Sequence, residues 1–228
     1  MGRKLRMGMV GGGKDAFIGA IHRLAANMDG MIELVCGALS INPQIAQESA
    51  EMLFLPQERT YLTYDEMITK EAALPADKRM DFVTIVTPNF AHFAPAMMAL
   101  EHGFNVVIEK PITFTLDEAK QLKAKVEETG LLLCLTHTYS GYPMVKQAKA
   151  MVADGVLGKI RKVWVEYPQG WLSKLSEREG PSPSINPNPN PSPSSSPCPR
   201  LTLTLDLALA PALTLNLTLT LTLALAQA

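Results

Sequence analysis

Cysteine is scarce in this sequence, and its scarcity excludes two classes of protein. The chain of 228 residues has three cysteines, and no two of them have the spacing of metal ligands. Cys36 and Cys134 lie inside apolar runs, which indicates buried and reduced thiols. We therefore expect a cytoplasmic protein without a disulfide framework and without a metal site.

Neither sign of charge is in excess. The sequence has 21 Lys and Arg against 22 Asp and Glu, a formal net charge of -1, and its basic residues are dispersed. The basic start at residues 1–6 lacks the apolar segment that a signal peptide needs. This distribution indicates a solvated surface of mixed sign and argues against nucleic acid as a partner. Nothing in it points to a membrane.

Charged residues nearly disappear after Gly180. Residues 181–228 contain Arg200 and Asp206 as their only charged side chains, and they consist mainly of Pro-Ser, Pro-Asn, Leu-Thr and Leu-Ala dipeptides. Such a shift in composition marks a low-complexity tail behind a globular part. The predicted segments are 1–140, 141–178 and the tail at 179–228.

Three interpretations of the tail remain open. The first is a disordered proline-rich linker followed by a segment that alternates like a β-strand. The second is a membrane span at 201–226, against which the threonines, Asp206 and Pro211 argue. The third, which we favour, is translated CCCTAA repeat DNA. That repeat encodes Pro-Asn in one frame and Leu-Thr in another, and one A-to-G change yields Pro-Ser and Leu-Ala.

Apolar runs alternate with helical patterns up to about residue 140. The runs are continuously apolar, as strands covered on both faces are, and the helical patterns begin at cap residues such as Asn42 and Thr115. The alternation predicts an α/β fold with a doubly wound parallel sheet of the Rossmann type. A helix at 143–154 and a strand at 159–167 would then start an α+β second domain. The expected strands are 7–10, 32–39, 81–87, 105–109 and 131–136, and the expected helices are 17–28, 43–53, one after Thr63, 90–103 and 116–129.

Three glycines follow the first expected strand. The spacing Gly11-x-Gly13-x-x-Ala16 is that of a dinucleotide-binding fingerprint, although Gly19 is an alternative third glycine. Glycine lets the backbone approach a pyrophosphate, and the helix that follows supplies amide donors. The alternative is a tight turn that binds nothing.

The acidic residue that binds the ribose of NAD is missing from the end of the second expected strand. No carboxylate lies between Glu33 and Glu48, and the strand ends near Ser40, whose hydroxyl could bond a ribose or stand beside a 2′-phosphate. The cofactor is therefore NAD or NADP. Equally, Ser40 could simply start a turn.

Two polar motifs follow the third and fourth expected strands. Thr87-Pro88-Asn89 with His92 comes after one strand, and Glu109-Lys110-Pro111 comes after the next. The carboxyl ends of parallel strands meet at the edge where open α/β sheets bind ligands. A lysine held there could bond a substrate hydroxyl during hydride transfer, although a lysine at a strand end is more often only solvated.

Together, the glycine turn and these two motifs resemble the Gfo/Idh/MocA family, named after glucose–fructose oxidoreductase and inositol dehydrogenase. The resemblance covers residues 5–178 and includes the segment 136–143 and Gly155-x-x-Gly158. It implies an NAD(P)-dependent oxidoreductase of sugar, cyclitol or related hydroxy substrates, with Lys110 as the catalytic lysine and His137 and Tyr139 near the substrate. The candidate cofactor-binding residues are Gly11, Gly13, Phe17, Ile18, Ser40, Thr87, Asn89, His92, Glu109 and Lys110.

The acid/base histidine that this resemblance implies is absent from its expected place, shortly after Trp171. All four histidines of the chain lie before the tail. We therefore expect dinucleotide binding without turnover, and the alternative is a non-catalytic dinucleotide-binding fragment or a gene-model artefact. The family-type homo-oligomer is not expected, because the large sheet that forms its contact is missing as well.

Overall fold

The computed structural model describes residues 2–14, 16–165 and 203–206. The chain divides into two compact units, Met1–His137 and Thr138–Ala228, which are described one at a time. The proposals for the tail therefore lie outside the described residues, except at 203–206.

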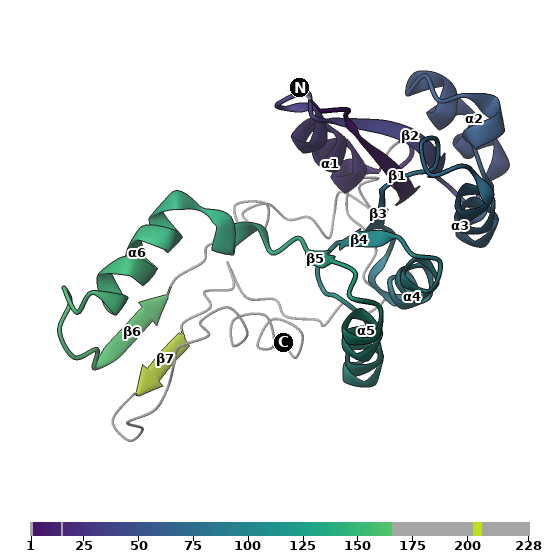
Figure 1. Ribbon diagram of the computed structural model, residues 1–228. Helices are drawn as coiled ribbons and strands as arrows, with labels where there is room; N and C mark the ends of the chain where they lie inside the picture. The colour runs from purple at the N-terminus through teal and green to yellow at the C-terminus, as the bar shows by residue number, and fades with distance from the viewer. Residues whose placement is uncertain (1, 15, 166–202, 207–228) are drawn as a thin grey trace, which may run out of the picture. The chain divides into compact units, whose positions relative to one another are not determined.

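The first unit is built on a parallel sheet of five strands in the order β2-β1-β3-β4-β5 (Figure 1). Each pair of neighbours is parallel, and each connection between consecutive strands contains a helix. This order confirms the predicted doubly wound Rossmann fold. The strands are β1 (Leu5–Gly11), β2 (Ile32–Ala38), β3 (Phe82–Val86), β4 (Asn105–Ile108) and β5 (Leu133–Leu135).

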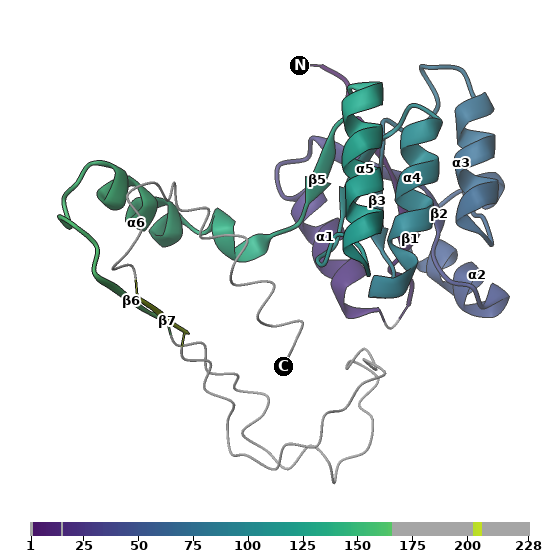
Figure 2. The same ribbon diagram turned by 90° about the horizontal axis from the view of Figure 1, so that it is seen from below.

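Helices lie on both faces of this sheet. In Figure 2, α3, α4 and α5 stand side by side along one face, while α1 lies behind the sheet on the other. The helices are α1 (Phe17–Asn27), α2 (Pro43–Met52), α3 (Tyr64–Ala73), α4 (Phe93–Glu101) and α5 (Leu116–Thr129). Short 3-10 turns occur at η1 (Gln57–Arg59) and η2 (Asn89–Ala91), so α4 begins three residues later than the expected start at 90.

The predicted cap residues start their helices. The side chain of Asn42 accepts hydrogen bonds from the backbone N–H groups of Gln44 and Ile45. Thr115 and Glu118 form a complete capping box at α5, and Gly130 ends that helix in the left-handed conformation with φ of 68°. Local sequence therefore determines where these helices begin and end.

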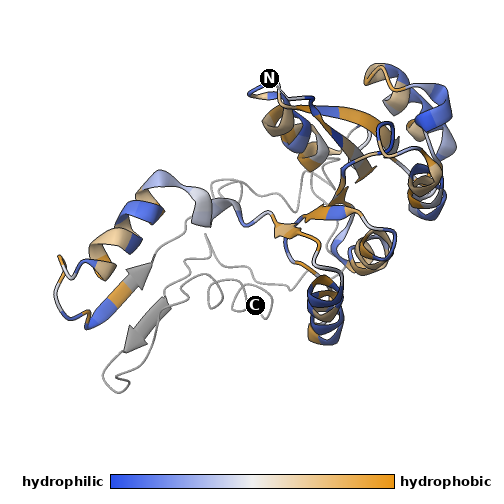
Figure 3. Ribbon diagram, in the orientation of Figure 1, coloured by the Kyte–Doolittle hydropathy of each residue, from blue (hydrophilic) through white to orange (hydrophobic). Residues whose placement is uncertain are grey.

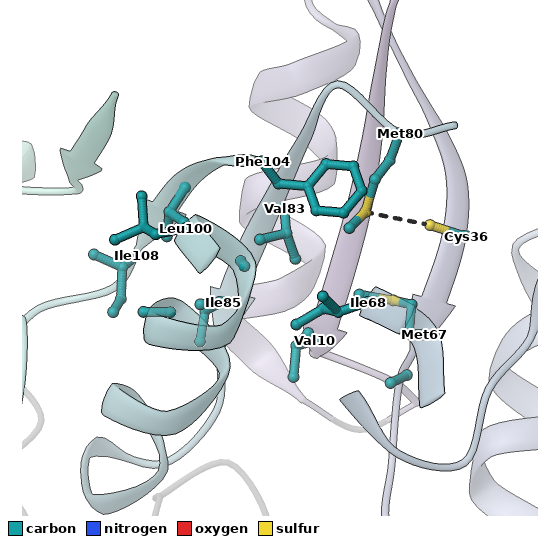
Figure 4. Close-up of a cluster of buried hydrophobic side chains, with 14 of the residues drawn as sticks. Val10, Cys36, Met67, Ile68, Met80, Val83, Ile85, Leu100, Phe104 and Ile108 are labelled. Atoms are coloured by element: carbon teal, nitrogen blue, oxygen red, sulfur yellow. Dashed lines mark hydrogen bonds between the residues drawn. The ribbon is translucent and has the colours of Figure 1, made fainter. Parts of the chain in front are cut away.

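The main core lies between the sheet and the row α3–α5. Figure 4 shows its side chains, with the Cys36 thiol 3.8 Å from the sulfur of Met80. In Figure 3 the strands are mostly hydrophobic, whereas α5 carries many hydrophilic residues. A smaller cluster on the other face includes Met7, Met9 and Val86, against which Ile18 of α1 packs.

One of the two thiols expected to be buried is exposed. Cys36 is buried, but Cys134 is exposed at the middle of β5. Leu133 and Leu135 pack against the core on the face covered by helices. Because side chains alternate along a strand, Cys134 points to the opposite face of this edge strand.

The second unit contains the elements expected after residue 140. A 3-10 turn η3 (Thr138–Gly141) leads into α6 (Pro143–Ala153), and β6 (Lys162–Val165) follows. β6 pairs antiparallel with β7 (Leu203–Asp206), which belongs to the Leu-Thr part of the tail. In the described residues, no helix is long and apolar enough to cross a membrane.

Candidate dinucleotide-binding edge

The glycine turn follows β1 and touches the first helix. Gly11 and Gly12 have φ of 79° and 72°, a conformation that strongly favours glycine. A Cβ on Gly19 would lie 2.4 Å from Gly12 Cα, so this helical glycine lets α1 pack directly on the turn. The geometry therefore favours Gly19, the alternative third glycine, for the close-packing role, and Ala16 does not fill it.

Among the described residues, no side chain caps the first turn of α1. The N–H groups of Gly13, Lys14 and Ala16 already donate to Leu39 O, Ser49 Oγ and Gly13 O at 3.1, 2.7 and 3.0 Å. Helix α1 has no side-chain cap and no acidic residue in its first turn. The first amides of a helix have no intrahelical acceptor, so those of Phe17 and Ile18 can donate hydrogen bonds to an anion.

A carboxylate that sequence reasoning did not place at this edge lies beside the turn. Glu48 of α2 is 2.9 Å from the ammonium of Lys14, and it also accepts a bond from Gln44. The Lys14 ammonium and the Gln44 amide hold the pKa of Glu48 below its ordinary value. No local sequence pattern relates Lys14 to Glu48, and only the fold brings the two side chains together.

Ser40 lies where the second strand was expected to end. Its Oγ accepts a hydrogen bond from Asn42 N at 3.1 Å, as a turn-forming serine does.

The buried side chain of His92 lies between the backbone segments that follow β3 and β4. Its side chain is fully buried, with Nδ1 2.7 Å from Pro111 O and Nε2 2.9 Å from Thr87 O. Both ring nitrogens thus face backbone carbonyl oxygens, although His92 was expected beside the nicotinamide. Thr87 donates its hydroxyl proton to Ala91 O at 3.0 Å, whereas Asn89 is exposed.

Glu109 is likewise buried, and its place beside the cofactor stays a prediction. Its Oε1 lies 2.9 Å from His22 Nε2 and 2.7 Å from Thr136 Oγ1, while Oε2 accepts a bond from Lys110 N at 3.1 Å. Burial alone would raise the pKa of Glu109. The bonds from His22, Thr136 and Lys110 N outweigh that effect and lower the pKa below its ordinary value. Sequence reasoning gave no role to His22 or to Thr136, although Thr136 begins the segment 136–143 that is part of the family resemblance.

Lys110 itself is exposed at the end of β4. The bond to Glu109 anchors its backbone, so the side chain is free to reach outward from a fixed point. His137, expected near the substrate, is the last residue of the first unit. Tyr139 belongs to the second unit, where its ring packs edge-on against Tyr142 with centroids 5.6 Å apart.

Comparison with known proteins identifies the family to which the first unit belongs. Residues 5–137 match the model of the Gfo/Idh/MocA oxidoreductase family, described as having an NAD-binding Rossmann fold. The chain belongs to this family. The resemblance inferred from the glycine turn, the Thr-Pro-Asn motif and the Glu-Lys-Pro motif is therefore confirmed.

Relatives within the family include structures with bound ligands. The oxidoreductase YfiI of Bacillus subtilis is 36% identical over 173 residues, which are 74% of this chain and 43% of the relative. An oxidoreductase from Sinorhizobium meliloti is 44% identical with a TM-score of 0.69, over 75% of this chain and 47% of that structure. An inositol dehydrogenase homologue from Azotobacter vinelandii, solved with NADH and myo-inositol, is 36% identical with a TM-score of 0.70 and coverages of 78% and 47%. The chain thus spans less than half the length of these relatives.

Proposed function

We propose that this chain is the dinucleotide-binding half of an NAD(P)-dependent oxidoreductase that acts on sugars, cyclitols or related hydroxy compounds. The observation that carries the proposal is the shared edge of the sheet. There, the uncapped first turn of α1 and the glycine turn lie at the end of β1, and an exposed lysine lies at the end of β4. Membership of the family gives this edge its cofactor, and the homologue solved with NADH and myo-inositol supports the class of substrate.

Some residues of this edge would bind the cofactor, and Lys110 would take part in the reaction. The amides of Phe17 and Ile18 would hold the pyrophosphate at the positive end of the α1 dipole. A nicotinamide held at this edge would supply the hydride-acceptor chemistry for oxidising a substrate hydroxyl, whose proton would go to a separate base. Lys110 would donate a hydrogen bond to that hydroxyl oxygen and stabilise the negative charge that develops there. Glu109 fixes the backbone from which Lys110 extends.

Both forms of the cofactor remain in the proposal. Glu48 is paired with Lys14, the residue that follows the glycines of the turn. An acid paired in this way is a weaker partner for the ribose of NAD than an unpaired one. A 2′-phosphate could instead take Lys14 from Glu48, which would favour NADP.

Cofactor binding and turnover are tested separately. We expect the purified chain to change the fluorescence of NADH or NADPH on titration, since the binding residues lie within the first unit. We expect no reduction of NAD⁺ or NADP⁺ with a panel of cyclitols and aldoses, because the sequence has no histidine after His137 to serve as the acid/base. Oxidation that disappears in Lys110→Ala would refute the second expectation. Absence of saturable binding of either nucleotide would refute the first.

A further inference from the structure

Arg23 is a partly buried cation that lies against the glycine turn. Its Nη1 donates a hydrogen bond to the carbonyl oxygen of Gly12 at 2.5 Å and lies 3.4 Å from the sulfur of Met9. Arg23 belongs to the second turn of α1, and long side chains of a helix point back toward its N-terminus. The side chain therefore runs along α1 toward its N-terminus, where no described side chain caps the first turn.

Arg23 differs from two other shielded arginines, which form ion pairs with carboxylates. Arg6 and Arg59, both shielded from solvent, meet the carboxylates of Asp81 and Glu71. Among the described residues, no carboxylate forms an ion pair with Arg23, whose polar neighbours are a carbonyl and a thioether. Burial lowers the pKa of Arg23, the direction expected when a cation is desolvated without an anion.

We infer that Arg23 is a positioning residue that keeps a positive charge behind the glycine turn for the pyrophosphate of the dinucleotide. The inference rests on the proposed function and extends it to a residue outside the fingerprint. Arg23 acts in two ways. Its hydrogen bond fixes the peptide after Gly12 and offsets the partial negative charge of that carbonyl. Its charge adds to the positive end of the α1 dipole, in whose first turn no acidic residue opposes it.

Three substitutions in the full chain separate charge from structure. Arg23→Lys keeps the charge, Arg23→Gln keeps an N–H donor without charge, and Arg23→Met keeps most of the length without either. NADH affinity is measured by fluorescence titration at low and high salt, and the melting temperature is measured without nucleotide. Lys123→Gln serves as the control, since Lys123 is an exposed cation on α5 that pairs with Glu127.

The charge mechanism predicts a distinct pattern. Arg23→Gln and Arg23→Met weaken NADH binding about tenfold at low salt, while Arg23→Lys stays within about threefold of the unmodified chain. The tenfold difference shrinks at high salt, because ions screen the charge. Without nucleotide, Arg23→Gln melts within about 2 °C of the unmodified chain, since an unbalanced cation stabilises the fold little. Lys123→Gln changes neither property.

Two other outcomes refute different statements. If all three substitutions lower affinity in proportion to a loss of melting temperature, Arg23 is a structural residue and the inference fails. If they leave affinity unchanged, the inference fails as well. In both cases the proposed function stands. If the unmodified chain binds no NADH, the proposed function fails and the inference with it. Should Arg23→Met not fold, the comparison of Arg23→Lys with Arg23→Gln decides alone.

Discussion

At the scale of single residues, the buried carboxylates of this protein hold backbone in place. Glu71 is fully buried and accepts bonds from Arg59, from the hydroxyl of Tyr61 and from Met80 N. Glu109 similarly connects His22, Thr136 and Lys110 N. In each case the acid satisfies donors that burial would otherwise leave without a partner, and such donors are costly.

Removing Glu71 should therefore be strongly destabilising. In Glu71→Ala, the guanidinium of Arg59 and the buried N–H of Met80 lose their acceptor. We expect a loss of about 3–5 kcal/mol in the free energy of unfolding, the range for breaking a buried ion pair. Urea denaturation followed by circular dichroism measures it, with the exposed Glu127→Ala as a control that should change stability by less than about 0.5 kcal/mol. A loss equal to that of the control would contradict the role assigned to Glu71.

The lowered pKa of Glu109 predicts how stability depends on pH. In the unfolded chain its carboxyl titrates near the ordinary value of 4.5, and in the folded protein the pKa is lower. The folded state therefore binds fewer protons, so the stabilisation from Glu109 is complete above about pH 4.5 and declines as the pH falls through the folded pKa. Urea midpoints of the unmodified chain and Glu109→Gln should differ at pH 7 and begin to converge as the pH falls below about 4.5. A constant difference across this range would show that the charge of Glu109 contributes nothing.

Residues of this kind mark the limit of prediction from sequence. The glycine turn, Thr87 and Lys110 were recognisable because they lie next to strand ends in a known pattern. His22, Arg23 and Glu48 reach the same edge from helices, and only the packing of α1 and α2 places them there. Cys134 was expected to be buried because its neighbours are apolar, but the exposed face of an edge strand could not be read from those neighbours.

At the scale of elements, local patterns predicted the strands and helices of the first unit well. Apolar runs identified all five strands, and cap residues identified the starts of α2 and α5. Boundaries were less certain where a 3-10 turn intervenes, as at η2 before α4. At helix α1 the pattern left Ala16 and Gly19 open as the third position of the fingerprint, and only the packing of α1 on the glycine turn favours Gly19.

A methyl group at that glycine should separate α1 from the turn. In Gly19→Ala, the new Cβ would overlap the backbone of Gly12, whose Cα and O would be 2.4 and 2.6 Å away. Backbone cannot yield as a flexible side chain can, so we expect a loss of about 1–3 kcal/mol in unfolding free energy and much weaker NADH binding. Thermal melting and fluorescence titration measure the two effects. Ala20→Ser, at the next and exposed position of α1, is the control, and equal behaviour of the two variants would contradict the packing argument.

At the scale of the whole molecule, the first unit contains every element that the proposed cofactor site uses. Its sheet is complete between Leu5 and Leu135, and the glycine turn, the α1 N-terminus and Lys110 all lie within it. The second unit contributes α6 and the pair β6–β7, in which a segment of the dipeptide tail serves as one of the two strands. We accordingly propose that cofactor binding is a property of residues 1–140, while 141–178 and 179–228 contribute nothing to it.

Deleting residues 179–228 tests this division. NADH affinity and the unfolding of the first unit should not change, because no residue of the proposed cofactor site is removed. By contrast, β6 should lose its pairing with β7, and an unpaired strand exposes N–H and C=O groups. Limited proteolysis should therefore cut the shortened chain faster near Lys162, while fragments of the first unit persist. Loss of NADH binding on deletion would place part of the cofactor site in the tail, and unchanged cleavage would show that the pairing of β6 with β7 does not protect this segment.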